Sequence, residues 1–188
     1  LYQYHLTALA SFPRSGNTWL RFLIEESTGI KTGSIYKDRV MTRGSEGIVI
    51  KTHELDSYRY TKAIHVIRNP FDAIESYYSW KIIVAHQEPD WSEHISESIE
   101  NWKNHTEHWL KVKYPVFRIR FEDLLTNPTN ELNNLLQWMG YELEPEEIKL
   151  VIEKSSLENM RKRSPNVGEK FFRQGKKGIG IEKITAEQ

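Results

Sequence analysis

Short apolar runs alternate with longer amphipathic stretches along the first two thirds of the chain. Apolar runs that end at proline, asparagine or charged residues are typical of buried strands. The predicted strands span residues 6–11, 48–50, 63–67 and 116–121. The predicted helices run from about residue 18 to 27, from Pro70 towards Trp80, and from 96 to 112, with loops at 29–47 and 84–91. This alternation predicts an α/β fold in three layers, with a central parallel sheet flanked by helices.

The last third of the chain carries a helical pattern. Its apolar positions recur with the spacing of one helix face, and they are Leu132, Leu135, Leu136 and Met139. Gly140 ends this helix and Pro145 begins the next. From Arg161 onward the periodicity is lost, and we expect a basic, glycine-containing tail. No repeat or linker-like stretch divides the sequence, so residues 1–188 are predicted to form one domain.

Composition narrows the function classes. Lys plus Arg and Asp plus Glu are both 26, so the formal net charge is zero, which argues against nucleic-acid binding and membrane-surface binding. No apolar run could span a bilayer and no signal peptide is recognisable, which favours a soluble, cytoplasmic protein, or a Golgi-lumen protein if the chain is a cut domain. The absence of cysteine excludes disulfides and a thiolate nucleophile. The seven histidines lack zinc-like spacing, so no metal is expected.

Segment 12–19, between the first predicted strand and the first helix, has the features of an anion-binding turn. Gly16 allows the backbone to turn closely around an anion, and the amides at the following helix start point towards it. Arg14 adds a guanidinium, and Trp19 offers a flat face on which a base can stack. The alternative is a plain turn with Trp19 in the core. The spacing and the lysine of a Walker A motif are absent here, which argues against a nucleoside-triphosphate enzyme.

A second candidate motif follows the strand at 63–67. Arg68 ends this strand, and Ser76 lies two turns into the next helix, so the two side chains could hold a second phosphate. The alternative is a surface pair of Arg68 with Asp72 and a solvated serine.

A third motif, Lys51-Thr52-His53, follows the strand at 48–50. A neutral histidine can accept a proton from a hydroxyl near neutral pH, and a neighbouring lysine can stabilise charge on a leaving oxygen. A structural histidine is the alternative. In parallel sheets ligands bind beyond the carboxyl ends of the strands, so the position of all three motifs agrees with their chemistry.

Together the motifs resemble the sulfotransferases that use 3′-phosphoadenosine 5′-phosphosulfate (PAPS). The resemblance rests on FPRSGNTW, KTH and IRNPFDAIESYYSW, and it continues through FEDLLTNP to KSSLENM and FFRQGKKG. The N-terminal part is similar to the WSC-domain carbohydrate sulfotransferases, whereas KTH and the C-terminal half are similar to the cytosolic ones. The resemblance implies a P-loop-like nucleotide-binding fold. It also implies transfer of the sulfonate group from PAPS to an acceptor hydroxyl, which leaves PAP and needs no metal.

The family's nucleotide contacts carry over to matching positions. The residues implied to hold the 5′ end are Arg14, Ser15, Gly16, Asn17 and Thr18. Trp19 is implied to stack on adenine, and Arg68 with Ser76 to bind the 3′-phosphate. Further contacts are implied for Ser155, Ser156, Arg173 and Gly175. His53 is implied to be the catalytic base, with Lys51 and Arg14 stabilising the leaving group.

Several positions depart from the family pattern. Gln174 replaces a lysine of the closing motif, and Phe121 stands where the cytosolic enzymes have tyrosine. Ile179-Gly180 follows Gly178 in place of an Asp-Trp pair. A PAP-binding relative that has lost turnover is therefore one alternative function, and a P-loop-type kinase is a second.

The acceptor is left open between a carbohydrate and a small alcohol or phenol. The aromatic residues that could line its pocket are Tyr36, Tyr77, Tyr78, Trp80 and Trp91. Such side chains suit sugars and phenols alike, so composition does not decide between them, and it does not define the oligomeric state.

Overall fold

A computed structural model describes residues 6–36, 49–163 and 178–186. Its described strands form one five-stranded, parallel sheet in the order β2-β3-β1-β4-β5. The strands are β1 (Thr7–Ser11), β2 (Gly33–Ser34), β3 (Val49–Thr52), β4 (Lys62–Ile67) and β5 (Val116–Arg120). The order confirms the predicted parallel sheet, with β1 at its centre.

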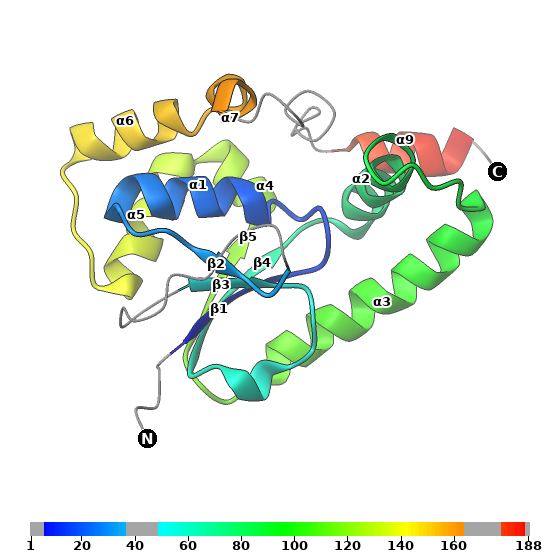
Figure 1. Cartoon of the computed structure of the whole chain (residues 1–188), viewed down its shortest axis with the longest axis horizontal. Helices are drawn as coiled ribbons and strands as arrows, with labels where there is room; N and C mark the ends of the chain where they lie inside the picture. The colour runs from blue at the N-terminus through cyan, green and yellow to red at the C-terminus, as the bar shows by residue number, and fades with distance from the viewer. Residues whose placement is uncertain (1–5, 37–48, 164–177, 187–188) are drawn as a thin grey trace.

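Helices cover both faces of the sheet (Figure 1). The helices of the first layer are α1 (Asn17–Thr28), α4 (Phe121–Thr126), α5 (Pro128–Met139) and α6 (Pro145–Lys154), followed by α7 (Leu157–Arg163). On the other side lie α2 (Pro70–Ile83), α3 (Trp91–Lys111) and α9 (Ile179–Ala186), with the short 3₁₀ helix η1 (Ser57–Arg59). The predicted three-layer α/β fold is therefore confirmed.

The two faces of the sheet are packed differently. Leu9, Ile64 and Ile119 pack against leucines and isoleucines of the first helical layer, in a cluster of large aliphatic side chains. The opposite face presents small residues, Ala8, Ala10 and Ala63, which leave room for the fully buried Trp109 of α3. The indole N–H of Trp109 donates to the carbonyl of Glu54 at 3.1 Å, so α3 also supports the loop after β3.

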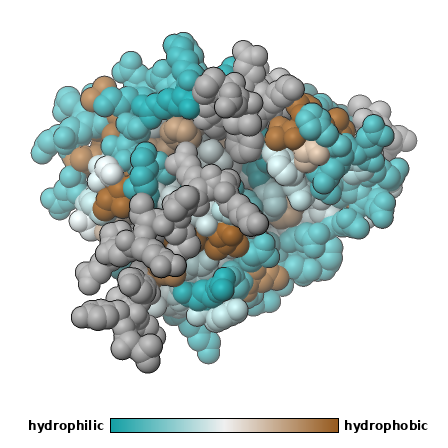
Figure 2. Space-filling model, in the orientation of Figure 1, coloured by the Kyte–Doolittle hydropathy of each residue, from teal (hydrophilic) through white to brown (hydrophobic). Residues whose placement is uncertain are grey.

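Hydrophobic side chains are used mainly between the layers. The face in Figure 2 is mostly hydrophilic, and its hydrophobic residues lie in small separate groups. Within the described residues, no helix is both long enough and apolar enough to cross a bilayer.

The structure corrects several predicted boundaries. The loop at 29–47 contains β2, and residues 37–48 lie outside the described part. The third helix begins at Trp91 rather than 96, because the Asp90 side chain caps it by accepting from the Glu93 amide at 2.9 Å. The strand predicted at 116–121 ends at Arg120, and Phe121 begins α4.

The expectation of a plain basic tail from Arg161 is wrong where the tail is described. Helix α7 extends to Arg163, and residues 179–186 form α9, which packs on α2. Residues 164–177 lie outside the described part of the chain.

Candidate functional site

The three candidate motifs meet at one edge of the sheet. The loop after β1 carries Arg14, His53 directly follows β3, and Arg68 directly follows β4. Strand β1 pairs with β3 on one side and with β4 on the other, and all three run in the same direction. Their carboxyl ends therefore bring the predicted phosphate-binding and proton-accepting side chains to neighbouring positions.

The turn between β1 and α1 is shaped by Gly16. Its φ of 98° is in the left-handed region, which glycine adopts without strain. A Cβ at this position would also overlap the side chain of Phe121, which begins α4. Arg14 has a positive φ of 65° as well, so two residues turn the chain sharply before α1 begins. Position 16 therefore requires glycine for two reasons: its positive φ, and the Phe121 ring that leaves no space for a Cβ.

Two polar side chains of this turn are buried in different ways. The Asn17 amide donates to the Leu9 carbonyl at 2.9 Å and to the Ser11 hydroxyl at 3.2 Å, so it braces the turn against β1. Ser15 is fully buried, and its hydroxyl has no hydrogen-bond partner among the described residues. A buried hydroxyl normally has a partner, so Ser15 suits a turn that binds a polar ligand. Asn17 would contribute to such a ligand through its backbone amide.

Arg68 joins the second motif to the first. Its guanidinium donates to the main-chain carbonyl of Arg14 at 2.8 Å, and the Nε of Arg14 donates to the Ser76 hydroxyl at 3.3 Å. The Arg68 guanidinium also lies over the Phe121 ring, 4.6 Å from its centroid. Arg68 is only 9% exposed and Asp72 binds elsewhere, which contradicts the alternative of a surface Arg68–Asp72 pair. Both arginines and Ser76 therefore belong to one site.

His53 is held through one ring nitrogen. Its Nδ1 lies 2.6 Å from the Ser11 carbonyl oxygen, and a carbonyl can only accept, so Nδ1 carries the hydrogen. In this tautomer the basic lone pair is on Nε2. The Ser11 hydroxyl lies 3.4 Å from the same Nδ1. The backbone at the end of β1 therefore fixes the ring in the form that a general base requires.

Tyr36 packs beside His53. Its ring lies 5.6 Å from the His53 ring, and its hydroxyl accepts from the His53 amide at 3.1 Å and donates to the Glu54 carboxylate at 3.0 Å. Burial is the main cause that raises the pKa of Tyr36, with a further contribution from Glu54. The Lys51 ammonium lies 5.3 Å from the centre of the same ring. Tyr36 is thus a neutral contact of His53 and Lys51, two of the three predicted catalytic residues, and the sequence motifs did not single it out for this role.

Three further predicted nucleotide contacts, Trp19, Ser155 and Ser156, belong to elements on the α1 side of the sheet. Trp19 is partly buried and meets Phe121 edge-on, with ring centres 6.1 Å apart. Ser155 is fully buried at the end of α6, and the Ser156 hydroxyl accepts from the Asn159 amide at the start of α7. The structure does not describe residues 164–177, which include Arg173, Gly175 and the glutamine Gln174 that replaces the family's lysine.

The predicted acceptor-lining aromatics fall into two groups. Tyr77 stacks on Trp80 with ring centres 6.0 Å apart, and Tyr78 meets Trp91 edge-on at 4.5 Å. These four residues belong to α2 and the start of α3, whereas Tyr36 lies beside His53. The first group follows Ser76 directly along α2.

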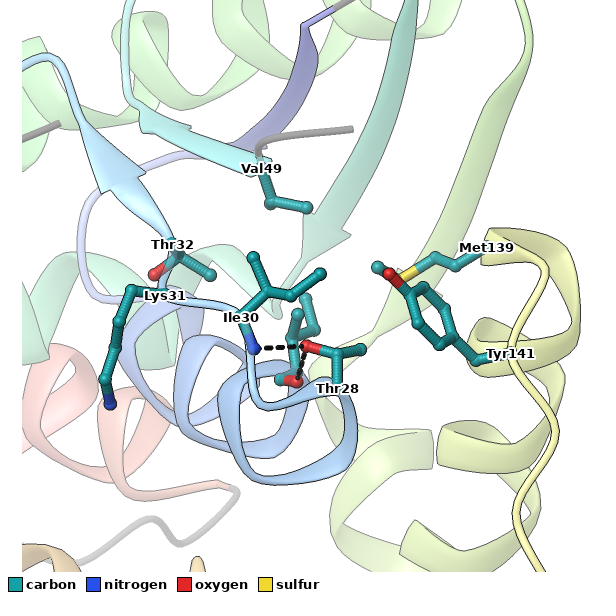
Figure 3. Close-up of a pocket in the computed structure, with 8 residues that line it drawn as sticks. Thr28, Ile30, Lys31, Thr32, Val49, Met139 and Tyr141 are labelled. Carbon is teal, nitrogen blue, oxygen red and sulfur yellow. Dashed lines mark hydrogen bonds between the residues drawn. The ribbon is translucent and has the colours of Figure 1, made fainter. Parts of the chain in front are cut away.

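A cavity at the far end of α1 does not belong to this site. Figure 3 shows it between the last turn of α1 and the segment around Tyr141. Its volume is about 10 Å³, which is room for about one water molecule. Within the described residues, no group of three or more His, Asp or Glu side chains could hold a metal ion.

A parallel sheet whose central strand leads through an arginine- and glycine-bearing turn into a helix defines a P-loop-like nucleotide-binding fold. Residues 50–188 match the family model for the sulfotransferase domain, and the chain belongs to this family. The family resemblance recognised in the sequence motifs is thereby confirmed.

Several individual proteins are similar to this chain in sequence. The chain is 30% identical over 171 residues to WSCD family member CG9164 of Drosophila melanogaster, covering 78% of this chain and 54% of the relative. It is 32% identical over 165 residues to WSCD family member AAEL009094 of Aedes aegypti, covering 75% and 52%. It is 25% identical over 201 residues to dog sulfotransferase 1A1, covering 83% and 66%. The chain thus spans about half the length of these WSCD relatives.

Solved structures share the fold. Mouse sulfotransferase SULT7A1 complexed with PAP superposes with a TM-score of 0.78 at 18% identity, covering 97% of this chain and 78% of that one. Retinol dehydratase in complex with androsterone and PAP gives a TM-score of 0.75 at 16% identity, covering 100% and 79%. At these identities the likeness establishes the architecture alone.

Proposed function

We propose that this chain transfers the sulfonate group of PAPS to an acceptor hydroxyl, with PAP and a sulfate ester as products. The observation that carries the proposal is the 2.8 Å hydrogen bond from the Arg68 guanidinium to the Arg14 carbonyl. It joins the predicted 5′-phosphate turn to the predicted 3′-phosphate arginine, so that one ligand with phosphates at both ends can contact both. Membership of the sulfotransferase domain family supports the same reaction.

The residues of the turn suit the 5′ end of such a nucleotide. The Ser15 hydroxyl is buried without a hydrogen-bond partner in the described part of the chain. The missing side chain of Gly16 lets the Phe121 ring pack directly against the turn. The amides of Asn17 and Thr18 begin α1, where the helix dipole favours negative charge. The Arg14 side chain adds a cation. PAPS would supply an activated sulfonate at this end.

The other end of the nucleotide would be held mainly by a residue that follows β4 and by a residue of α2. Arg68 and Ser76 would bind the 3′-phosphate, and Trp19 would stack on adenine. Ser155 and Ser156 are proposed as further contacts. Arg173 and Gly175 stay predicted contacts to the 3′-phosphate.

For the chemical step, the His53 Nε2 accepts the proton of the acceptor hydroxyl while that oxygen bonds to sulfur. The bond from sulfur to the phosphate oxygen breaks at the same time, and its electron pair stays on the phosphate. Arg14 and Lys51 stabilise the charge that develops there. The Ser11 carbonyl keeps the proton of His53 on Nδ1, so Nε2 is the basic nitrogen throughout.

The acceptor is proposed to be a carbohydrate or a small alcohol or phenol. The stacked Tyr77 and Trp80 beside Ser76 would form one wall of its pocket, and Tyr36 beside His53 would form another. Retinol dehydratase is a structural neighbour that binds androsterone, which supports a small alcohol. The resemblance of the N-terminal part of this chain to the WSC-domain carbohydrate sulfotransferases supports a carbohydrate. Aromatic side chains bind sugars and phenols alike, so a transfer assay with a panel of acceptors has to distinguish the two classes.

Two measurements test the proposal. In a thermal-shift assay, PAP should raise the unfolding temperature, and ATP with Mg²⁺ should raise it far less. Radiolabelled PAPS should then transfer label to at least one member of a panel of sugars, alcohols and phenols. A chain that responds to ATP with Mg²⁺ but ignores PAP would refute the proposal.

The second candidate function is PAP binding without turnover. Gln174 in place of a lysine, and Ile179-Gly180 in place of Asp-Trp, favour this candidate. It predicts the same thermal shift with PAP but no labelled product with any acceptor.

A further inference from the structure

Asp72 connects the starts of two helices that are distant in sequence. It is the third residue of α2 and is only 3% exposed. Its two carboxylate oxygens accept separately, Oδ2 from the Gly178 amide and Oδ1 from the Gly180 amide, each at 2.8 Å. Hydrogen bonds to a carboxylate are stronger than those between neutral groups. The first turn of α9 is therefore fastened to α2 by a single side chain.

Two further contacts hold α9 along the same side of α2. A Cβ on Gly180 would overlap the backbone of Phe71, so the two backbones are in direct contact. The Lys183 ammonium lies 2.6 Å from the Glu75 carboxylate, and Glu75 is only 5% exposed. Asp72 and Glu75 are three residues apart and so share a helix face. Helix α9 therefore packs against this face of α2.

The same helix supplies the predicted phosphate site. Ser76, which follows Glu75, accepts from the Arg14 side chain at 3.3 Å. Arg68 directly precedes Asn69, whose side chain caps α2 by accepting from the amides of Phe71 and Asp72. The first two turns of α2 thus lie between α9 and the phosphate turn.

From this arrangement we propose that Asp72 is a positioning residue for the nucleotide site. Its carboxylate holds α9 against α2, and α9 in turn fixes the orientation in which α2 presents Arg68 and Ser76 to the 3′-phosphate. The inference rests on the proposed function, because it concerns the affinity of that site for PAP. Asp72 itself does not touch the nucleotide in this proposal.

Substitution with asparagine should break the connection with little change in size. An amide has one acceptor oxygen, so Asp72→Asn leaves either the Gly178 or the Gly180 amide opposite an N–H donor. Gly180→Ala should separate the same two helices by a different route, because the new methyl group meets the Phe71 backbone. Both changes act on one contact, so their effects should not add.

The experiment measures PAP affinity by calorimetry, and thermal stability, in the chain of residues 1–188. Asp72→Asn and Gly180→Ala should each raise the Kd for PAP about tenfold, and the double variant should do no more. Asp90→Asn is the matched control, because Asp90 also caps a helix but begins α3. It should leave the Kd unchanged even if it lowers the unfolding temperature.

The possible results separate the two proposals. If Asp72→Asn and Gly180→Ala lower the unfolding temperature but keep the Kd of the parent, Asp72 is structural and the inference is overturned, while the proposed function stands. If Asp90→Asn weakens PAP binding as much as Asp72→Asn does, the positioning role of Asp72 is overturned too. A parent chain that does not bind PAP overturns the proposed function first. If Asp72→Asn does not fold, the milder Lys183→Met decides, and a Kd equal to that of the parent again refutes the inference.

Discussion

Arg68 donates a hydrogen bond from its guanidinium to the main-chain carbonyl of Arg14, at 2.8 Å. Arg68 directly follows β4 and Arg14 lies in the turn after β1, so this bond connects two segments 54 residues apart. A direct hydrogen bond therefore joins the two predicted phosphate-binding elements.

Arg68→Lys should weaken PAP binding although it keeps the charge. A lysine ammonium cannot reproduce the planar donors that reach both the Arg14 carbonyl and a phosphate, so we expect a loss of roughly 10- to 100-fold in affinity. Calorimetric titration with PAP checks this. Arg118→Lys is the control, since Arg118 is an exposed arginine on β5, and it should bind PAP like the parent.

Gly16→Ala should destabilise the fold more than Gly140→Ala. Both glycines have positive φ angles, 98° and 84°, so each alanine carries backbone strain of about 1–2 kcal/mol. A Cβ at position 140 has open space, whereas one at position 16 meets the Phe121 ring. Overpacking should add about 1–3 kcal/mol for Gly16→Ala. Urea unfolding of both variants measures the difference, and equal losses would contradict the Phe121 contact.

Replacing His53 with alanine should reduce turnover and spare nucleotide binding. Loss of a general base lowers a rate by roughly 10²–10⁴. PAP affinity should persist, because the proposed nucleotide contacts lie on other residues. Single-turnover transfer from PAPS to the acceptor found by screening provides the rate. His108→Ala, at a histidine that binds Ser57 instead, should keep the rate of the parent. A His53→Ala enzyme of normal rate would reject the base assignment.

Two buried histidines should make stability depend on pH. His65 on β4 and His105 on α3 have ring centres 5.8 Å apart and are 1% and 3% exposed. Burial lowers the pKa of His65 to about 4, with Arg118 adding to the shift. Burial also lowers the pKa of His105 to about 3, with contributions from the neighbouring His65, His53 and His108. The folded chain therefore favours both rings in the neutral form.

The direction of the pH effect follows from the lowered pKa values. The unfolded chain takes up protons below pH about 6.5, before the folded chain does, so unfolding becomes easier as the pH falls. The contribution of these histidines to the free energy of unfolding should be fully present above about pH 6.5. It should decline towards pH 4, by up to about 1.4 kcal/mol per pH unit for each histidine. Urea unfolding between pH 8 and pH 5 measures the slope. His105→Phe should reduce the slope, and an unchanged slope would show that this histidine takes no part.

The sequence predicted those features that depend on local chemistry. Pro70 marks the start of α2 and Gly16 marks the turn before α1, because proline restricts the backbone and glycine frees it at these positions. Strand β2 was missed because its two residues are held by backbone pairing with β3, which has no side-chain pattern. Helix α9 was missed because its position depends on Asp72, more than 100 residues earlier.

Within the site, the sequence indicated which residues are involved more readily than how their side chains are oriented. The motifs indicated Arg14, Arg68 and Ser76, and the structure brings them together. They did not indicate that Asn17 turns inwards, because its partners at Leu9 and Ser11 are defined only once β1 and α1 have met. The role of Tyr36 beside His53 was missed for the same reason.

The indole of Trp109 reaches under the sheet to the Glu54 carbonyl, next to His53. Evolutionary change in α3 can therefore shift the segment proposed to face the acceptor without altering any residue proposed to contact the donor. Relatives that share one donor could diversify their acceptors through a helix that contains none of the recognisable motifs.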